Sequence, residues 1–178
     1  MKIENSFTVE APYGLVWAHL IDIPTIASCL PGVVVGEEVD GVYAGSVKSK
    51  VGPVTAEYRS SAHFVESDEA TGRIVLDASG RDSRTEGNVR MLVTAQVRSV
   101  GPEQTRVDMS TAVSGTGRVA QLGRGVLQTV SEKMLAQFVI CLSIKLDQAS
   151  NEGAQTPSRD VVPQVTEASD HDALDLLD

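Results

Sequence analysis

The sequence is poor in cysteine, histidine and aromatic residues, and these shortages exclude several kinds of site. Its two cysteines, Cys29 and Cys141, match no metal-binding spacing and no Cys-x-x-Cys motif. Both lie in apolar surroundings, so we expect two buried free thiols. The histidines His19, His63 and His171 share no spacing with acidic residues that would suggest a metal site, and we expect none.

Lysine and arginine are scarce as well. Together they number 15 against 24 acidic residues, for a formal net charge of -9. Most of this charge lies from Asp147 onward, where Arg159 is the one basic residue, so residues 1–146 are close to neutral. The body therefore offers no basic face to a nucleic acid and no polybasic patch to anionic lipid. Residues 147–178 are acidic, polar and interrupted by proline, and we expect a disordered tail.

Long apolar runs and catalytic motifs are missing too. No stretch reaches the length of a membrane span, and the first residues lack the apolar run of a signal peptide, so we expect a cytoplasmic protein. No nucleophile elbow, phosphate-binding loop or pair of catalytic carboxylates is present, and we assign no catalytic residue and expect no enzyme. The charged segment GRDSRTEG, residues 80–87, is interpreted as a solvated turn, with a contact to a partner protein as the alternative.

The hydrophobic pattern predicts one strand, two short helices, six further strands and one long helix. Residues 2–10 alternate between apolar and polar side chains, and Pro12 ends this strand. Helical spacing follows over residues 13–21 and again from Asp22 to about Leu30. Six strand-like runs then follow, separated by turn residues, and a helix is expected from Arg118 to about Lys145, with Ser131 on its polar side.

This order of elements predicts an α+β fold. Short consecutive strands favour an antiparallel meander, and one apolar face of such a sheet must be covered. We expect a curved antiparallel seven-stranded sheet around a long C-terminal helix, with two short helices after the first strand. The predicted domain covers residues 1–146, and residues 147–178 form the tail.

Three segments resemble a known family: FTVEAPYGLVWAHLIDIPTIASCLPG, then GSVKSKVGPVTAEYRSSAHF, then GTGRVAQLGRGVLQTVSEKMLAQF. They look like the CoxG family of aerobic carbon monoxide dehydrogenase systems, over residues 1 to about 146. The resemblance implies the START-like helix-grip fold of the SRPBCC superfamily, which holds apolar ligands between a curved sheet and a C-terminal helix. It also implies an accessory protein of a molybdenum-containing dehydrogenase that carries a quinone, such as menaquinone, between the membrane and the enzyme.

Strand and helix periodicity supplies candidate residues for an apolar cavity. Few of them are aromatic, which suits a roomy interior, and the hydroxyls of Tyr58, Ser60 and Thr111 suit the carbonyl groups of a quinone. The alternative is an ordinary packed core. The candidates are Trp17, Leu20, Ile26, Leu30, Val47, Val51, Tyr58, Ser60, Phe64, Leu76, Met91, Val93, Met109, Thr111, Leu122, Val126, Val130 and Met134.

The expected function is therefore that of a non-enzymatic quinone carrier, in which the quinone is a carried ligand and no cofactor is covalently bound. Its expected partners are the carbon monoxide dehydrogenase and, transiently, the inner face of the cell membrane. Two alternatives stay open. One is a factor that recruits or assembles the dehydrogenase at the membrane without transferring quinone. The other is a START-like cyclase or hydrolase acting on an aromatic substrate, which would need an acid and a base inside the cavity.

Overall fold

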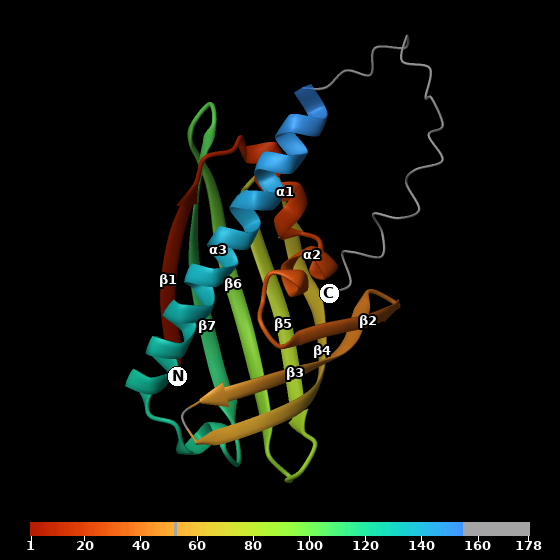
Figure 1. Cartoon of the computed structure of the whole chain (residues 1–178), viewed down its shortest axis with the longest axis vertical. Coiled ribbons are helices and arrows are strands. Elements are labelled where there is room, and N and C mark those ends of the chain that lie inside the picture. Colours follow the sequence, from red (N-terminus) through yellow and green to blue (C-terminus); the bar gives the residue numbers. More distant parts are fainter. Residues whose placement is uncertain (52, 155–178) are drawn as a thin grey trace, which may run out of the picture. The chain divides into compact units, whose positions relative to one another are not determined.

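The computed structural model describes residues 1–51 and 53–154 (Figure 1). Residues Met1–Gln148 form one compact unit, and the chain from Ala149 onward forms a second. The strands are β1 Lys2–Val9, β2 Val33–Val39, β3 Val42–Val51, β4 Val54–Asp68, β5 Arg73–Asp82, β6 Asn88–Gly101 and β7 Gln104–Gly115. The helices are α1 Tyr13–Leu20, α2 Ile23–Ser28, the short 3-10 helix η1 Val119–Gln121 and α3 Arg124–Ala154.

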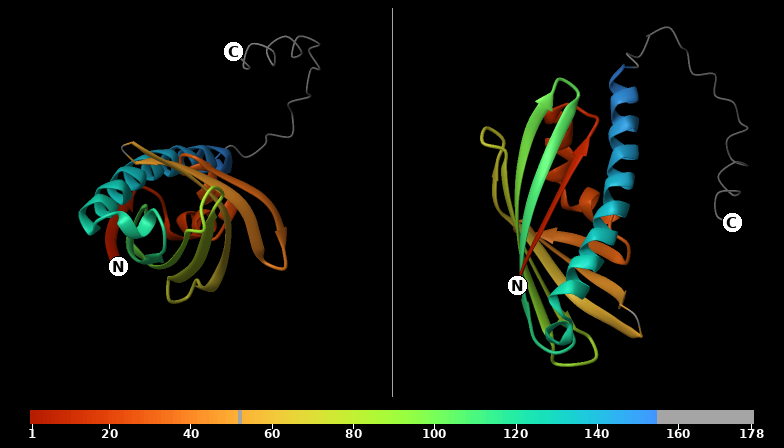
Figure 2. Two further views of the ribbon diagram at one scale, coloured as in Figure 1. Left: turned by 90° about the horizontal axis from the view of Figure 1, so that it is seen from below. Right: turned by 90° about the vertical axis from the view of Figure 1, so that its left-hand side faces the viewer.

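All seven strands belong to one antiparallel sheet in the order β1-β7-β6-β5-β4-β3-β2. Strands β2 to β7 are a meander, and β1 pairs with β7 to add the last edge. The sheet curves, and α3 runs along its concave side (Figure 2), with α1 toward one end of the sheet and α2 nearer its middle (Figure 1). The predicted α+β helix-grip architecture is confirmed.

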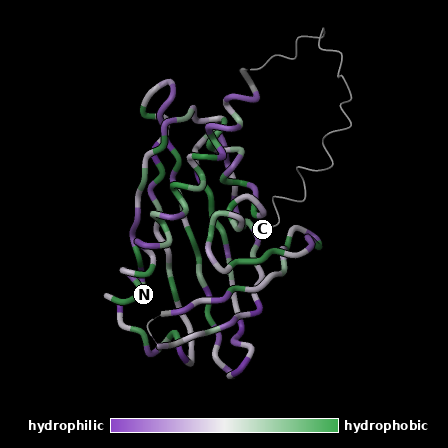
Figure 3. Tube along the Cα trace, viewed as in Figure 1, coloured by the Kyte–Doolittle hydropathy of each residue, from purple (hydrophilic) through white to green (hydrophobic). Residues whose placement is uncertain are grey.

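The strand register places a continuous set of side chains on the concave face. In one cross-strand row, Phe64, Leu76, Val93 and Thr111 follow one another from β4 to β7. Apolar and polar residues alternate along the strands (Figure 3), as expected for a sheet with one covered face. The predicted inward face is therefore the observed one.

The packed core lies at the end of the concave face that holds the short helices. The ring of Phe138 on α3 meets the ring of Phe7 on β1 edge to face, with centroids 6.1 Å apart. Leu142 and Leu146, one and two turns further along α3, are almost fully buried in the same cluster. This half of α3 is therefore fixed to the sheet by aliphatic and aromatic packing.

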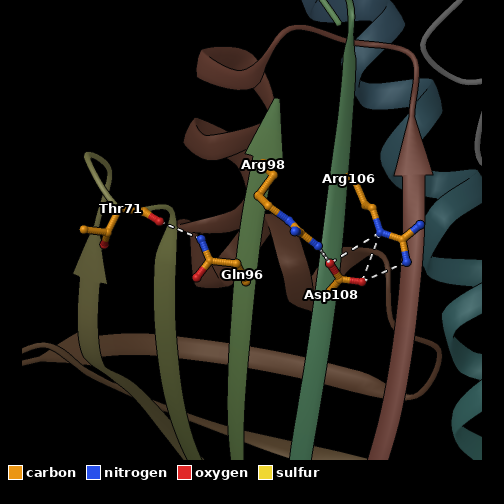
Figure 4. A network of polar contacts seen from close by, with 5 residues as sticks. All are labelled: Thr71, Gln96, Arg98, Arg106 and Asp108. Carbon is orange, nitrogen blue, oxygen red and sulfur yellow. Dashed lines mark hydrogen bonds and ion pairs between the residues drawn. The ribbon is translucent and has the colours of Figure 1, made fainter. Parts of the chain in front are cut away.

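The convex face of the sheet is polar. The Asp108 carboxylate on β7 pairs with both Arg98 on β6 and Arg106 on β7, and Gln96 donates a hydrogen bond to the Thr71 carbonyl (Figure 4). Cross-strand ion pairs of this kind suit a water-facing surface. An apolar ligand held by the sheet therefore belongs on the concave side.

The long helix begins later than predicted. Arg118 precedes η1, and Leu122 has an extended backbone, with φ -79° and ψ 132°, so α3 starts only at Arg124. Glycines at positions 123 and 125 weaken the helix at this point. The helix also ends later than predicted, at Ala154. Residues 147–154, which we expected to begin the disordered tail, belong to this helix, so that part of the prediction is wrong. The rest of the expected tail, residues 155–178, lies outside the described residues.

The prediction of two free thiols is wrong. Cys29, at the end of α2, and Cys141, in α3, form a disulfide with their Cα atoms 5.4 Å apart. The two cysteines are 112 residues apart, so no local sequence motif indicated that they pair. The helix-grip topology itself brings the end of α2 against the middle of α3, which is the geometry that a disulfide needs.

Candidate functional site

Away from the packed core, the concave face of the sheet stays accessible to solvent. Met91 lies on this side of β6 and is 38% exposed. We call this region the open inner surface. It is made of partly buried or exposed side chains that share the concave face: Val47, Ser60, Ala62, Phe64, Leu76, Ala78, Met91, Val93 and Thr111.

The first turns of α3 also carry apolar side chains that are only partly buried. Val130 and Met134 are half-buried, and Val126 is 42% exposed. Asn5 of β1 donates a hydrogen bond to the Ser131 hydroxyl over 3.2 Å, which marks where α3 passes β1. Ser131 thus faces the sheet, and its expected place on the polar side of the helix is wrong. The N-terminal half of α3 is held by one polar contact and few buried apolar groups.

The predicted site residues fall into separate groups. Most strand candidates lie on the open inner surface, with Met109 half-buried beside the core. Trp17 and Leu20 are buried in the packed core, and Ile26 and Leu30 are half-buried against it. Leu122 is half-buried in the segment before α3. The side chain of Val51 lies outside the described residues.

A buried polar group lies at the end of the concave face opposite the packed core. Asp82, the last residue of β5, pairs in register with Tyr58 of β4. Its side chain is 1% exposed, and its Oδ2 atom lies 3.5 Å from Nε of Arg118. Arg118 also donates a hydrogen bond to the backbone carbonyl of Thr55. One carboxylate, one guanidinium and one phenol therefore meet at the edge of the open inner surface.

This group corrects the interpretation of the charged hairpin. Asp82 is not part of a solvated turn, because its side chain points inward and is ion-paired. The alternation that places Leu76 and Ala78 on the concave face continues through Gly80 to Asp82, so the signal was present in the sequence. Arg118 carried no such signal, since it lies outside the strands.

The protonation states of this group follow from its surroundings. The backbone N–H of Arg84 donates to Asp82 Oδ1 over 2.9 Å, and this bond is the main cause that lowers the pKa of Asp82. Burial raises the pKa of Tyr58, and the negative charge of Asp82 raises it further. At neutral pH the site therefore combines a carboxylate acceptor with a protonated phenol donor.

A second apolar feature lies on the side of α3 that faces away from the sheet. Ile140 and Ile144 are 64% and 52% exposed there. They belong to a shallow hollow of about 390 Å³ lined by Gln137, Ile140, Cys141, Ile144, Lys145 and Gln148. Within residues 1–51 and 53–154, no helix has the length and apolar character needed to cross a membrane.

Comparison with known proteins places these features in context. Residues 6–147 match the family model for CoxG, a subunit of carbon monoxide dehydrogenase. A conserved protein from Geobacillus kaustophilus matches the structure with a TM-score of 0.74 and 15% identity, over 84% of this chain and 97% of that chain. A comparison with curated protein sequences finds no match.

Two other solved structures have the same fold at low sequence identity. The Zhui aromatase/cyclase from Streptomyces sp. R1128 has a TM-score of 0.60 and 18% identity, over 84% of this chain and 95% of that chain. A START superfamily protein from Mycobacterium smegmatis has a TM-score of 0.59 and 8% identity, over 83% of this chain and 98% of that chain. These similarities extend to the fold and not to ligands.

Proposed function

The chain belongs to the CoxG family of carbon monoxide dehydrogenase proteins, and we propose that it carries a quinone, such as menaquinone, between the membrane and the dehydrogenase. Membership of this family supports an association with the dehydrogenase, and the START-like fold supports an apolar ligand. The proposal concerns the identity of that ligand, its transfer and the role of the inner face of the membrane.

The open inner surface is the observation that carries the proposal. Its apolar side chains stay partly accessible although they share the concave face with α3, and Met91 is 38% accessible to water. Burying such surface against a ligand is favourable by about 25 cal/mol per Å². The ring and isoprenoid chain of a quinone supply the apolar area that would complete this incomplete core.

Polar groups on the same surface support a ligand with oxygen substituents. Thr111 and Ser60 carry hydroxyls on the concave face. The Ser60 hydroxyl makes only a long contact of 3.5 Å to a backbone carbonyl. A quinone offers carbonyl acceptors to hydroxyl donors of this kind, whereas a plain hydrocarbon does not.

We propose a non-enzymatic role. A cyclase or hydrolase would need an acid and a base that act on the substrate. Asp82 is a charged group on the concave face, but the hydrogen bond from the Arg84 N–H lowers its pKa, which makes its carboxylate a weak general base. The carrier therefore explains the apolar surface without requiring chemistry from this carboxylate.

The decisive experiment compares Val93→Trp with Leu92→Trp. Val93 faces α3 on the open inner surface, whereas Leu92 is its neighbour on the convex face and is 39% exposed. After purification from a menaquinone-producing host, bound quinone is measured by native mass spectrometry and solvent extraction. We expect wild type and Leu92→Trp to retain menaquinone and Val93→Trp to lose it.

The exposed hollow on α3 favours one second candidate, a recruitment factor that binds the dehydrogenase or the membrane through Ile140 and Ile144 without carrying quinone. The same experiment separates the two. A wild-type protein that is purified empty and takes up no added menaquinone would support recruitment and contradict the carrier.

A further inference from the structure

The polar group at the far end of the open inner surface is not fully satisfied by the described residues. Asp82 is buried at the end of a strand, yet its Oδ2 atom accepts no hydrogen bond from the described residues. The nearest cation, at Arg118, lies 3.5 Å away, which is an ion-pair distance and a long one for a hydrogen bond. A buried carboxylate oxygen without a donor is costly unless something else supplies one.

The neighbouring donors are also incompletely used. Among the described residues, the Tyr58 hydroxyl has no hydrogen-bond partner, and the residue as a whole is 8% exposed. Arg118 uses one N–H on the Thr55 carbonyl, and its side chain is 30% exposed. A guanidinium has five N–H donors, so several of them remain free to bind a further acceptor.

Strand β5 packs closely against its neighbours beside these groups. Gly80 lies on the concave face between them and the apolar strip. A Cβ atom at this position would come within 3.1 Å of Tyr58 Cβ, 3.2 Å of Ser60 Oγ and 3.3 Å of Val89 Cγ1. Glycine therefore allows Tyr58, Ser60 and Val89 to pack closely together over this position. The polar group is continuous with the open inner surface through these three side chains.

We infer that Arg118, Asp82 and Tyr58 form a subsite for the oxygen-bearing head of the carried ligand. Arg118 and Tyr58 donate hydrogen bonds to a carbonyl of an oxidised quinone. Asp82 positions Arg118 and accepts a hydrogen bond from a hydroxyl of the reduced hydroquinone. This inference rests on the proposed function, and it adds that the head lies at the Arg118 end of the surface and that both redox forms find a partner there.

The test compares two small aromatic probes by isothermal titration calorimetry. Menadione has the naphthoquinone ring with its two carbonyls, and 2-methylnaphthalene has the same ring without oxygen. We expect Tyr58→Phe and Arg118→Met to weaken menadione binding about tenfold each. Binding of 2-methylnaphthalene should change less than about twofold, because it uses only the apolar surface.

Two further variants distinguish a loss of ligand contacts from a loss of the folded structure. Arg118→Met leaves Asp82 buried without a cation, so the double variant Arg118→Met/Asp82→Asn is measured beside it, with thermal unfolding as the check on fold. The matched control is Arg90→Met, which removes an ion pair with Asp77 on the convex face. The control should bind both probes as wild type does.

Asp82→Asn tests the acceptor role separately. Under anaerobic conditions, we expect this variant to weaken binding of menadiol more than binding of menadione, because an amide presents one acceptor oxygen in place of two. An equal loss for both probes would overturn the role of Asp82 toward the hydroquinone.

The outcomes also distinguish the subsite from the carrier. If wild type and the Arg118 and Tyr58 variants bind menadione equally well, the subsite is wrong and the carrier stands. If wild type binds neither menadione nor menaquinone, the carrier is wrong and the subsite fails with it.

Discussion

Cys29 at the end of α2 is joined to Cys141 in the middle of α3 by a disulfide. Cys29 is buried and Cys141 is partly exposed, and the bond ties the short helices to the long one beside the packed core. The short helices and α3 therefore cannot separate at this point while the bond is intact. Disulfides are typical of oxidising compartments, so this one adds no support to the expected cytoplasmic location.

Removing this bond should lower stability. We expect Cys141→Ser, or reduction of the wild type, to lower the free energy of unfolding by about 2–4 kcal/mol, because a long loop is no longer closed in the unfolded chain. Urea unfolding with and without reductant measures the change. Ser143→Ala, two residues along α3, is the control. A wild type with two titratable thiols under non-reducing denaturing conditions would contradict the disulfide.

Phe138→Ala should destabilise the protein more strongly than any change on the outer side of α3. The side chain is buried against Phe7, so its removal leaves a cavity and should cost about 3–5 kcal/mol. Ile140→Ala, at a position that is 64% exposed, is the matched control and should change the free energy of unfolding by less than about 0.5 kcal/mol. Equal effects in urea unfolding would show that α3 is not anchored at Phe138.

Acid should weaken the fold partly through Asp82. Its pKa is lowered in the folded protein, so the carboxylate stabilises the fold above its ordinary pKa of 3.8. This contribution is lost as the pH falls from that value through the lower folded pKa. Asp82→Asn should therefore be less stable than wild type at about pH 6, and the difference should shrink by about pH 3. Urea unfolding at both pH values measures it, and a constant difference would contradict the prediction.

The exposed isoleucines on α3 should matter for association and not for stability. We expect Ile140→Ser/Ile144→Ser to change the free energy of unfolding by less than about 0.5 kcal/mol per substitution. Binding to the dehydrogenase, measured by biolayer interferometry with purified enzyme, should weaken at least about tenfold. Ala136→Ser, on an exposed position of the same helix, is the control. Unchanged binding would place the contact elsewhere.

Much of the fold follows from local pattern. Alternation, β-branched residues and turn residues together located every strand. Alternation also placed Val47, Phe64, Val93 and Thr111 on one face, because one side of the sheet must be covered. Contacts between residues far apart in the sequence could not be predicted from local pattern. The disulfide depends on how the topology folds α2 against α3, and the partner of Asp82 depends on where the chain between β7 and α3 passes.

The candidate site was only partly predictable for a related reason. Periodicity reports that a face is turned inward, and it does not report how closely the opposite element approaches. Trp17 and Met91 carry the same inward signal, yet Trp17 is 4% exposed and Met91 is 38% exposed. The difference arises from the path of α3, which is anchored at Phe138 and supported more weakly before Ser131.

Unequal anchoring of α3 has a kinetic consequence. The turns from Phe138 to Leu146 are buried in the core, so their amides should exchange with solvent only at a free energy close to that of global unfolding. The turns around Val126 and Val130 can open locally at a much smaller free energy. Under the proposed carrier function, we expect ligand exchange to proceed many times within the lifetime of one folded molecule, at a rate set by the loosely held turns and not by the stability of the whole domain.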